Sequence, residues 1–353
     1  MSAISLIELP PKIEKAIIRI LSRIDTNKWI NSAIQLSSKY RLNRDTIESY
    51  DDVFLDGVDD VLGYLALRTP ATYAQLYGAM FNIVEMLPSW KPISILDIGS
   101  GPGTAVWAAS DIWTSINKVT CLERDHNFSR IGKEILQSSL PELINLDWKT
   151  IDLSVSKPEL DVKFDLVTIG SVLNEMTNKQ RKDILEFAYN HCKGVLLVVE
   201  PGTPYGLEAI KQASILLHAH EGTLIAPYID NTLPLSDHEK IRFTQKIIRP
   251  EFHRRIRQKQ RKINNTSDKR LLPASDWEKT KYGYVAMSTI PTKITPFARL
   301  IAKPAIFKSH IELKILTKNG VKNQRILKRD KPYYKFAKKM KWGELLNSPK
   351  KIN

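Results

Sequence analysis

The most constraining feature of this sequence is a short apolar segment followed at once by alternating glycines. Residues 93–98 read Ile-Ser-Ile-Leu-Asp-Ile, and the glycines are Gly99, Gly101 and Gly103. A run of this kind is typical of a strand buried in a parallel sheet. Glycines directly after such a strand allow a tight turn and a close approach of the backbone to a ligand. We therefore expect a strand that carries Asp97, a ligand-binding turn and then a helix.

A second strand that ends in a carboxylate indicates the class of ligand. Residues 118–123 read Lys-Val-Thr-Cys-Leu-Glu, and in open α/β sheets a carboxylate at the place of Glu123 hydrogen-bonds the ribose hydroxyls of a nucleoside. Thr104 stands where the dinucleotide fingerprint requires glycine, and no lysine follows the glycines as a P-loop requires. The pattern favours a nucleoside without a phosphate and resembles the S-adenosylmethionine site of class I methyltransferases. An ordinary glycine-rich turn is the alternative.

Length and composition bound the class of protein. The 353 residues suffice for one large or two ordinary domains, and the apolar fraction of 42% allows a packed core. The longest uncharged aliphatic run, Val195 to Val199, is too short to span a bilayer. The first residues lack the basic stretch of a secretory signal. The sequence therefore predicts a cytoplasmic protein that does not enter a membrane.

Charge is distributed unevenly along the chain. Residues 240–353 hold 31 Lys and Arg against 7 Asp and Glu, a balance of +24, although the whole chain carries only +15. Residues 1–239 therefore carry −9. A basic module on an acidic body indicates a polyanionic partner, because each cation set against a phosphate releases counterions. A solvated lysine-rich face is the alternative.

Hydrophobic periodicity divides the chain into three predicted domains. Residues 1–90 show helical spacing of apolar residues and are expected to form an N-terminal helical domain. Residues 91–290 alternate strands with helices, which predicts a parallel doubly wound sheet with a basic insertion at about 228–280. Residues 291–353 are expected to form a basic extension with a β-hairpin and a helix. The predicted fold class is α/β, a Rossmann-like class I methyltransferase fold with these two additions.

The same patterns place the individual elements. After the two strands above, strands are expected at 148–153, 164–170, 194–200, 222–227 and 282–288, and helices at about 180–190 and 206–220. Asn319-Gly320 separates two strand-like runs, 310–317 and 321–327, and is the strongest short signal for a hairpin. A last helix is expected over 333–346.

Further polar residues fall at the predicted carboxyl ends of the later strands, where open α/β sheets bind ligands. Asp152 can accept a hydrogen bond from an adenine amino group or cap a turn. Asn174 and Glu175 follow the fourth strand and are candidates for lining the acceptor side of the cleft, although the Asn-Pro-Pro-Tyr type of run that seats a target nitrogen is missing. Glu200 ends the fifth strand and is expected to point into the cleft. A turn with an exposed glutamate is its alternative.

Nucleophile and metal chemistry are not supported. Cys121 lies inside a predicted strand and Cys192 at the amino end of another, so neither is placed for covalent pyrimidine methylation. His218 and His220, two residues apart, point in different directions on a helix, and no Cys/His cluster completes a metal site. The catalytic residues remain unknown, and no metal is expected.

The basic module supplies candidates for RNA contacts, which would bind phosphates beside aromatic residues that can stack on bases. A solvated helix face is again the alternative. The candidates are Arg254, Arg255, Arg257, Lys259, Arg261, Lys262, Lys338 and Lys339.

Several stretches together resemble the mitochondrial small-ribosomal-subunit assembly methyltransferase-like family and its bacterial relatives, over about residues 36–346. The most specific are Arg68-Thr-Pro-Ala-Thr-Tyr73 and Glu200-Pro-Gly-Thr-Pro204, and weaker ones are Leu36-Ser-Ser-Lys-Tyr-Arg41 and Lys341-Trp-Gly343. The resemblance implies a class I methyltransferase fold, S-adenosylmethionine binding and association with the small ribosomal subunit during its assembly. It also suggests that the helical domain, with Arg68 and Tyr73, roofs the cleft.

One departure from the family is large. Many members carry four cysteines that bind an iron–sulfur cluster, the first in an Ala-Pro-Cys-Pro-His stretch. Here that stretch reads Ala226-Pro-Tyr-Ile-Asp230, and the other positions fall near 233–234, 241–242 and 316, where no cysteine or histidine stands. We therefore expect a cluster-free member in which Tyr, Ile and Leu fill the space with apolar packing.

The sequence as a whole predicts an S-adenosylmethionine-dependent methyltransferase-like protein that acts on, or docks to, small-subunit ribosomal RNA. Its predicted cofactor-binding residues are Asp97, Gly99, Gly101, Gly103, Glu123 and Asp152. One rival is a non-catalytic assembly factor whose cofactor site is structural or regulatory, because a fold does not fix a function. Another is a small-molecule methyltransferase, which would have no use for the basic module. The oligomeric state is open.

Overall fold

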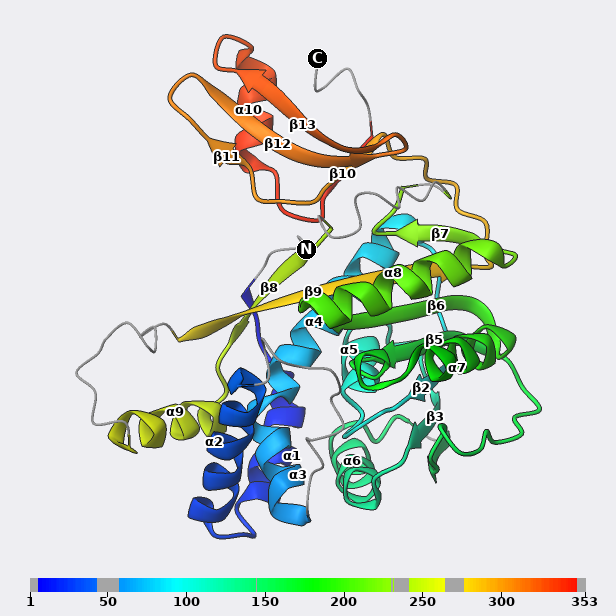
Figure 1. Ribbon diagram of the computed structural model, residues 1–353, viewed down its shortest axis with the longest axis vertical. Helices are drawn as coiled ribbons and strands as arrows, with labels where there is room; N and C mark the ends of the chain where they lie inside the picture. Colours follow the sequence, from blue (N-terminus) through cyan, green and yellow to red (C-terminus); the bar gives the residue numbers. More distant parts are fainter. Residues whose placement is uncertain are drawn as a thin grey trace.

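The computed structural model describes residues 6–42, 57–143, 145–229, 231, 241–263 and 276–347. A large mixed sheet with helices on both faces lies at its centre, and a smaller sheet with one helix lies at one end (Figure 1). Across these residues no helix has both the length and the apolar character needed to cross a membrane.

Parallel strands build the middle of the large sheet. In the order β4-β3-β2-β5-β6, they are β4 (Asn145–Thr150), β3 (Lys118–Glu123), β2 (Ser94–Ile98), β5 (Phe164–Gly170) and β6 (Cys192–Pro201). The sheet continues with β9 (Trp277–Ser288) antiparallel to β6, β8 (Phe243–Ile248) antiparallel to β9, and β1 (Leu6–Ile7) parallel to β8. This is a doubly wound Rossmann-like sheet of the class I methyltransferase type, and the predicted fold class is confirmed.

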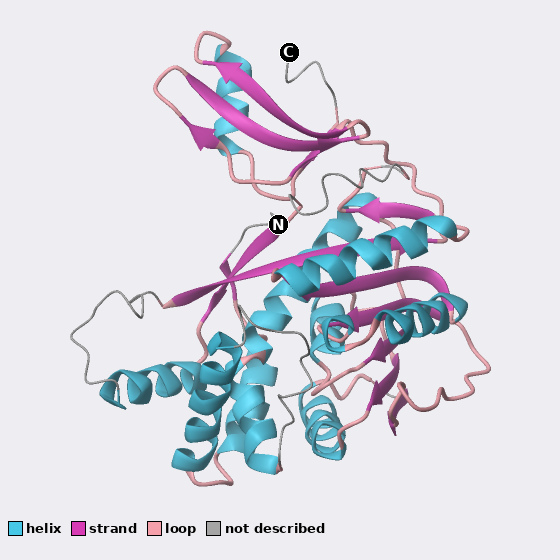
Figure 2. Ribbon diagram, in the orientation of Figure 1, coloured by secondary structure: helices cyan, strands magenta, loops and turns pink. Residues whose placement is uncertain are grey.

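Helices cover both faces of this sheet (Figure 2). One face carries α7 (Asn178–Asn190) and α8 (Pro204–Ala219), and the other carries α4 (Thr69–Met86) and α5 (Thr104–Ile112). Helix α6 (His126–Ser139) packs on β3 and β4. Both faces of the central strands are therefore closed to solvent, which explains why strands such as β2 are buried along their whole length.

The predicted N-terminal helices are present but do not form a separate core. They are α1 (Pro11–Leu21), α2 (Thr26–Leu42), α3 (Val58–Leu67) and α4. One hydrophobic cluster runs from Ile7 through these helices and the sheet to Leu316. The predicted border at residue 90 therefore does not separate two cores, because α4 packs on α5 and β9 as an integral layer of the sheet domain.

The region between 222 and 280 differs from the sequence prediction. The predicted sixth strand is only the four-residue β7 (Thr223–Ala226), which pairs with β9. The predicted insertion contains β8, helix α9 (Glu251–Ile263) and the start of β9. Strand β8 escaped notice because it alternates buried Phe243, Gln245 and Ile247 with half-buried residues and has no continuous apolar run. In addition, β4 begins and ends three residues earlier than the strand predicted at 148–153.

The C-terminal residues form a small sheet that contains the predicted hairpin, together with three further short strands and a helix. Its strands are β10 (Ala298–Leu300), β11 (Ala305–Ile306), β12 (His310–Thr317), β13 (Gly320–Leu327) and β14 (Leu345–Leu346). The predicted hairpin is confirmed in β12 and β13, which meet at the Thr317–Gly320 pair. Helix α10 (Lys331–Lys339) ends well before residue 346, because the chain turns at Gly343, with φ at +93°, and returns as β14 beside β10.

A fully buried arginine joins this small sheet to the large domain. Arg299 on β10 donates from Nη1 to Asn82 Oδ1 on α4 (2.8 Å) and to the carbonyl oxygen of Gly343 (2.8 Å), and from Nε to the carbonyl oxygen of Pro227 (3.0 Å). The Glu85 carboxylate on α4 lies 3.4 Å from the same Nη1. One guanidinium thus bridges α4, the segment after β7 and the turn before β14.

Replacing this arginine should destabilise the protein strongly. Arg299→Ala leaves the Glu85 carboxylate and two carbonyl groups without their donor, and removing one partner of a buried ion pair typically costs about 3–5 kcal/mol. Urea unfolding should show this loss in the free energy of unfolding. Arg325→Ala, which removes an exposed arginine of the same small sheet, serves as the control and should cost less than about 1 kcal/mol. Equal losses for the two variants would contradict the role given to Arg299.

Candidate functional site

The glycine turn lies where the strand order of the sheet reverses, with β3 on one side of β2 and β5 on the other. Gly99, Gly101 and Gly103 have φ angles of +66°, +52° and +87°, a region that residues other than glycine rarely adopt. The amide N–H groups of Gly99 and Ser100 both donate to the carbonyl oxygen of Leu122 on β3, at 2.8 and 3.1 Å. The turn is therefore fastened to the carboxyl end of the neighbouring strand.

The three glycines meet different constraints. A Cβ added to Gly99 would lie 2.3 Å from Val172 Cγ2, so the turn packs directly against the chain after β5. A Cβ added to Gly103 would lie 3.2 Å from the Trp148 ring. A Cβ added to Gly101 would meet nothing within 4 Å. Gly101 alone therefore faces open space, as expected of the point where a ligand approaches the backbone.

Glu123 closes the turn from the end of β3. Its Oε2 accepts the Gly101 N–H at 2.7 Å and its Oε1 accepts the Asp125 N–H at 2.9 Å. The side chain is only 8% exposed, and burial raises the pKa of Glu123, while the two N–H groups act in the opposite direction. Each carboxylate oxygen has a second lone pair. The predicted ribose-binding residue thus lies beside the turn, as the sequence pattern required.

Asp97 on β2 is a buried carboxyl with one oxygen unused. Its Oδ1 accepts the hydroxyl of Thr168 on β5 at 2.8 Å, whereas its Oδ2 is buried without a hydrogen-bond partner. Burial raises the pKa of Asp97 to about 7, the Thr168 hydroxyl opposes this rise, and the nearby charge of Glu123 adds to it. A cationic group bound at this place would satisfy Oδ2 and favour the ionised form.

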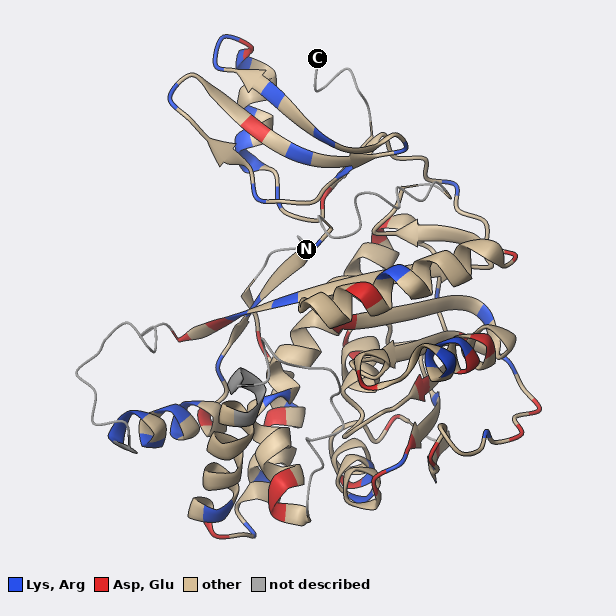
Figure 3. Ribbon diagram, in the orientation of Figure 1, with Lys and Arg blue, Asp and Glu red and all other residues tan. Residues whose placement is uncertain are grey.

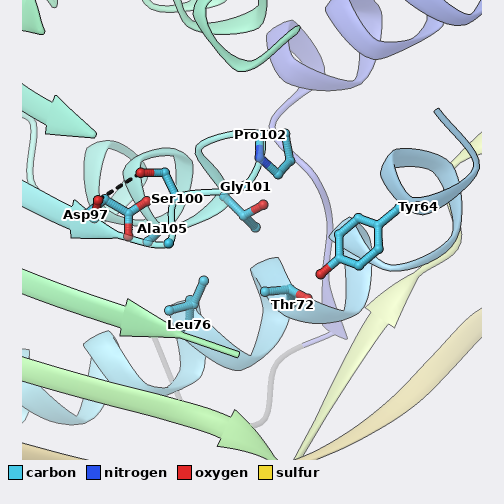
Figure 4. Close-up of a pocket in the computed structure, with 11 residues that line it drawn as sticks. Tyr64, Thr72, Leu76, Asp97, Ser100, Gly101, Pro102 and Ala105 are labelled. Atoms are coloured by element: carbon cyan, nitrogen blue, oxygen red, sulfur yellow. Dashed lines mark hydrogen bonds between the residues drawn. The ribbon is translucent and has the colours of Figure 1, made fainter. Parts of the chain in front are cut away.

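A pocket opens over the turn, and part of the N-terminal helical segment forms its other wall (Figure 4). Tyr64 of α3 and Thr72 of α4 lie across the pocket from Gly101, with the Tyr64 hydroxyl pointing toward Thr72, and Leu76 lies one turn farther along α4, across from Asp97 and Ala105. The lining residues are Tyr64, Thr72, Leu76, Asp97, Gly99, Ser100, Gly101, Pro102, Thr104, Ala105 and Gly170.

The residues expected to roof the cleft are not the ones that line this pocket. Tyr73 is fully buried and its hydroxyl donates to Asp111 Oδ2 at 2.8 Å, so it joins α4 to α5. Arg68 lies at the junction of α3 and α4, where its charge acts on Glu278 of β9. The spacing of apolar residues predicted the helices correctly. It could not show which of their residues, Tyr64 and Thr72 among them, line the pocket at the glycine turn.

Asp152 lies two residues beyond the end of β4. Its Oδ1 accepts the N–H and the hydroxyl of Ser154, at 2.9 and 2.6 Å, and these bonds lower the pKa of Asp152. Asp152 therefore caps a turn in the structure and is not among the pocket-lining residues. Its contact with an adenine amino group stays a prediction.

The segment after β5 is held in an uncommon conformation beside the pocket. Ser171 has a φ of +61°, which is rare for a residue other than glycine and indicates local strain. Asn174 is 8% exposed, and its Oδ1 is buried without a partner. Glu175 is exposed and lies 3.7 Å from Arg124 in a surface ion pair. Of the two acceptor-side candidates, only Glu175 reaches solvent.

Glu200 does not point into an open cleft, so that expectation was wrong. Its side chain is fully buried, and its Oε1 accepts the N–H groups of Val172 and Leu173 at 3.0 and 2.8 Å. Arg181 of α7 donates from Nε to the carbonyl oxygen of the same Leu173 at 2.7 Å. The N–H groups of Val172 and Leu173 bind the Glu200 carboxylate inside the protein. The segment 171–175 is thus held by Glu200 of β6 and by Arg181 of α7.

The predicted RNA-binding residues lie on two separate helices (Figure 3). On α9, which packs on α2 and α3, Arg254, Arg255, Arg261 and Lys262 are exposed and Arg257 and Lys259 are half-buried. Arg255 is paired with Glu251, and the Lys259 ammonium donates to Asn27 Oδ1 on α2 at 2.6 Å. Lys338 and Lys339 are exposed at the end of α10. The predicted basic surface is thus divided between the two ends of the molecule.

Comparison with known proteins gives a family match over most of the chain. A family model described as mitochondrial small ribosomal subunit Rsm22 matches residues 58–347. The human mitochondrial ribosome assembly protein METTL17 is 27% identical over 162 residues, 44% of this chain and 35% of that protein. The mitochondrial Rsm22-cox11 tandem protein 2 of Schizosaccharomyces pombe is 23% identical over 330 residues, 81% of this chain and 43% of that protein. The chain spans less than half the length of these curated relatives.

Solved structures with similar folds are methyltransferases. A putative RNA methyltransferase from Pyrococcus horikoshii is 13% identical, with a TM-score of 0.37, over 62% of this chain and 89% of that one. The magnesium protoporphyrin IX methyltransferase of Synechocystis is 13% identical, with a TM-score of 0.36, over 57% of this chain and 88% of that one. Likenesses this weak add nothing to a fold assignment that stands on the strand order.

The relatives also correct one expectation. METTL17 and both Rsm22-cox11 tandem proteins are mitochondrial proteins. The prediction of a cytoplasmic protein, which rested on composition and on the lack of a recognisable signal, is therefore wrong. Composition carries too little information to distinguish these compartments.

The buried Glu200 should make stability depend on pH. Burial raises the pKa of Glu200 to about 8 from an ordinary value of 4.5. Between these values the folded state holds a proton that the unfolded state has released, so this group makes the protein less stable as pH rises toward 8. Glu200→Gln keeps the acceptor for Val172 and Leu173 but cannot titrate. Thermal and urea unfolding should show the variant gaining about 1–3 kcal/mol on the wild type between pH 5 and pH 8.5.

The exposed Glu142→Gln variant is the control for Glu200→Gln and should show no such pH-dependent gain. A difference between Glu200→Gln and wild type that stays constant with pH would contradict the raised pKa.

Proposed function

Because this chain belongs to the family of the mitochondrial small ribosomal subunit protein Rsm22, we propose that it is an S-adenosylmethionine-binding, methyltransferase-like protein that docks to, or acts on, small-subunit ribosomal RNA during assembly. The observation that carries the cofactor part is the pocket at the carboxyl ends of β2 and β3. There an open glycine backbone lies between two buried carboxyls. The family match carries the ribosomal part.

The residues present fit S-adenosylmethionine. The open space at Gly101 admits the methionine part against the backbone, and the unpartnered Oδ2 of Asp97 suits its ammonium group. Glu123 retains lone pairs for the ribose hydroxyls, and Asp152 is the candidate for the adenine amino group. When bound, the cofactor would supply an activated methyl group. Tyr64, Thr72 and Leu76 would separate the site from solvent.

The non-catalytic alternative has specific support. The side chain of Glu200 is committed to the backbone of the segment 171–175, and Asn174 is buried beside it. Among the described residues, Glu175 is then the one acceptor-side candidate that is exposed, and it is paired with Arg124. Cofactor binding and RNA docking are therefore better supported than methyl transfer. A small-molecule methyltransferase would leave the basic surfaces on α9 and α10 unused.

We also propose that this member works without an iron–sulfur cluster. At three of the four positions where the family places cysteines, Tyr228, Ile241 and Leu316 are 2%, 5% and 1% exposed and belong to one hydrophobic cluster. The remaining position, near 233–234, lies outside the described residues. Tyrosine, isoleucine and leucine offer no thiolate ligand, so the described residues do not fit a cluster. Apolar packing at these positions supports the proposal.

Cofactor binding can be tested at Gly101. Gly101→Arg places a long side chain into the open space of the pocket and should weaken S-adenosylmethionine binding in calorimetry by more than about 100-fold, which equals about 2.7 kcal/mol. The control is Gly57→Arg, at another glycine with positive φ (+88°) and open space around its Cβ that does not line the pocket. It should bind like wild type. Absence of wild-type binding at millimolar ligand would overturn the cofactor proposal.

The same variants distinguish enzyme from assembly factor. If the protein transfers methyl groups, small-subunit RNA should take up a labelled methyl with wild type and not with Gly101→Arg or Glu123→Ala. If wild type binds the cofactor and the subunit but transfers no label, the assembly-factor alternative holds.

RNA docking through α9 can be tested by its salt dependence. Arg254→Gln with Lys262→Gln removes two exposed charges. For each phosphate that the variant no longer neutralises, the slope of log K against log salt for ribosomal RNA fragments should fall by about 0.7–0.9. Lys179→Gln with Lys182→Gln removes two exposed charges from α7 and should leave the slope unchanged. Equal effects of the two pairs would mean that binding follows net charge rather than α9.

A further inference from the structure

The small C-terminal sheet has one covered face and one partly open face. Its covered face carries Ile311, Leu313 and Ile315 of β12, which pack with Ala337 of α10 in a separate core. Because side chains alternate along a strand, His310, Glu312, Lys314 and Leu316 lie on the other face. Leu316 belongs to the core of the large domain, so that end of the face is docked. The opposite end, around His310, projects from the molecule (Figure 1).

An exposed aromatic pair lies at this projecting end. The Phe307 and His310 rings are stacked, with centroids 4.6 Å apart and planes 10° apart. The two residues lie opposite each other, since the Phe307 N–H donates to the carbonyl oxygen of His310 at 2.9 Å. Phe307 is nevertheless 48% exposed. About half of Phe307 therefore stays accessible to solvent although its ring is stacked on His310.

Polar contacts fix the histidine under this ring. His310 Nδ1 lies 3.0 Å from the Ser309 hydroxyl, and His310 Nε2 lies 3.3 Å from Glu312 Oε1. The same Glu312 oxygen accepts from Arg325 Nη2 of β13 at 3.0 Å. Phe307 therefore rests on a ring whose orientation is held from both nitrogens. Such a rigid aromatic surface loses little conformational freedom when a further ring stacks on it.

The charge around this pair is strongly positive. Residues 297–347, all within the described part of the chain, contain 14 Lys and Arg and 3 Asp and Glu. Lys314 lies on the open face and is half-buried, whereas Lys308, Arg325 and Lys328, in the adjoining turn, in β13 and just after it, are exposed. Figure 3 shows Lys and Arg spread over this part of the molecule. These cations and the aromatic pair are the two kinds of group that bind a single strand, since cations bind its phosphates and a ring stacks on its bases.

We propose that Phe307, stacked on His310 and flanked by Lys308, Lys314, Arg325 and Lys328, forms a base-stacking site for single-stranded RNA, which we call the stacking surface. Proteins that bind single strands combine a basic surface with aromatic rings on which bases stack. A duplex keeps its bases within its own stack and can offer only phosphates to Phe307. The inference rests on the proposed ribosomal RNA partner and specifies an unpaired segment of that RNA.

The test uses the full chain and a short single-stranded RNA with 2-aminopurine between uridines, whose fluorescence falls when the base stacks on a ring. Wild type should quench the base, and Phe307→Ala should abolish the quenching and weaken binding about 5- to 150-fold, since one stacked base contributes about 1–3 kcal/mol. Phe307→Trp should restore both. The matched control is Ile306→Ala, because Ile306 is exposed by 54% and its side chain faces the opposite side of the sheet. It should behave like wild type.

The outcomes separate this inference from the proposed function. If wild type binds the RNA but Phe307→Ala and Ile306→Ala bind and quench alike, the stacking surface is wrong while the RNA partner stands. If wild type binds a duplex of the same sequence as tightly as the single strand, the surface binds phosphates only, and base stacking is likewise contradicted. If wild type binds neither RNA nor small subunits, the proposed function itself fails.

A membrane partner is tested with anionic phospholipid vesicles. If Phe307→Ala loses vesicle binding and keeps RNA binding, the stacking surface binds a membrane rather than RNA. Thermal unfolding of each variant shows whether it is folded.

Discussion

The buried guanidinium of Arg299 connects the two parts of this protein. Its hydrogen bonds reach Asn82 on α4, the carbonyl oxygen of Pro227 after β7 and that of Gly343 before β14. Helix α4 also carries Thr72 and Leu76, which face the glycine turn across the pocket. The basic C-terminal sheet is therefore anchored to the helix that covers the proposed cofactor site.

Three buried carboxyls at strand ends perform different tasks because their surroundings differ. Glu123 fixes the glycine turn, Glu200 fixes the segment after β5, and Asp97 keeps one oxygen without a partner. All three have a raised pKa, since burial disfavours the charged form. A raised pKa therefore does not by itself identify a ligand-binding group here. An unpartnered oxygen does not identify it either, because Asp97 Oδ2 and Glu200 Oε2 are both buried without a hydrogen-bond partner. The position of Asp97 in the pocket wall, together with the open backbone at Gly101, is what marks the proposed site.

Local patterns in the sequence were enough to predict the sheet and the glycine turn, but not the direction of individual side chains. Strands β2, β5 and β6 are mostly apolar because helices bury both faces of the sheet there, so they were recognisable. Strand β3 was recognised from its short apolar positions and the carboxylate at its end. Strand β8 is buried on one face only, and its mixed composition concealed it. Glu123 and Glu200 each end a parallel strand, yet Glu200 turns inward to N–H groups that a single sequence cannot place. The pocket residues on α3 and α4 depend on long-range packing, which periodicity does not specify.

The placement of the basic surfaces helps to distinguish between methyl transfer and docking as the use of this protein. Helix α9 and the C-terminal sheet lie toward opposite ends of the molecule, and the glycine turn lies in the domain between them (Figures 1 and 3). A methyltransferase needs to hold its acceptor only near the transferred group, because proximity and orientation at that atom provide the rate enhancement. Two basic surfaces toward opposite ends of the molecule instead suit a partner that extends along it (Figure 3). Each surface raises the effective concentration of the RNA at the other, so a folded RNA bound at both ends is held more tightly than either surface could hold it alone. If the proposed function is right, docking accounts for the two basic surfaces, and the pocket would add a small ligand to that role.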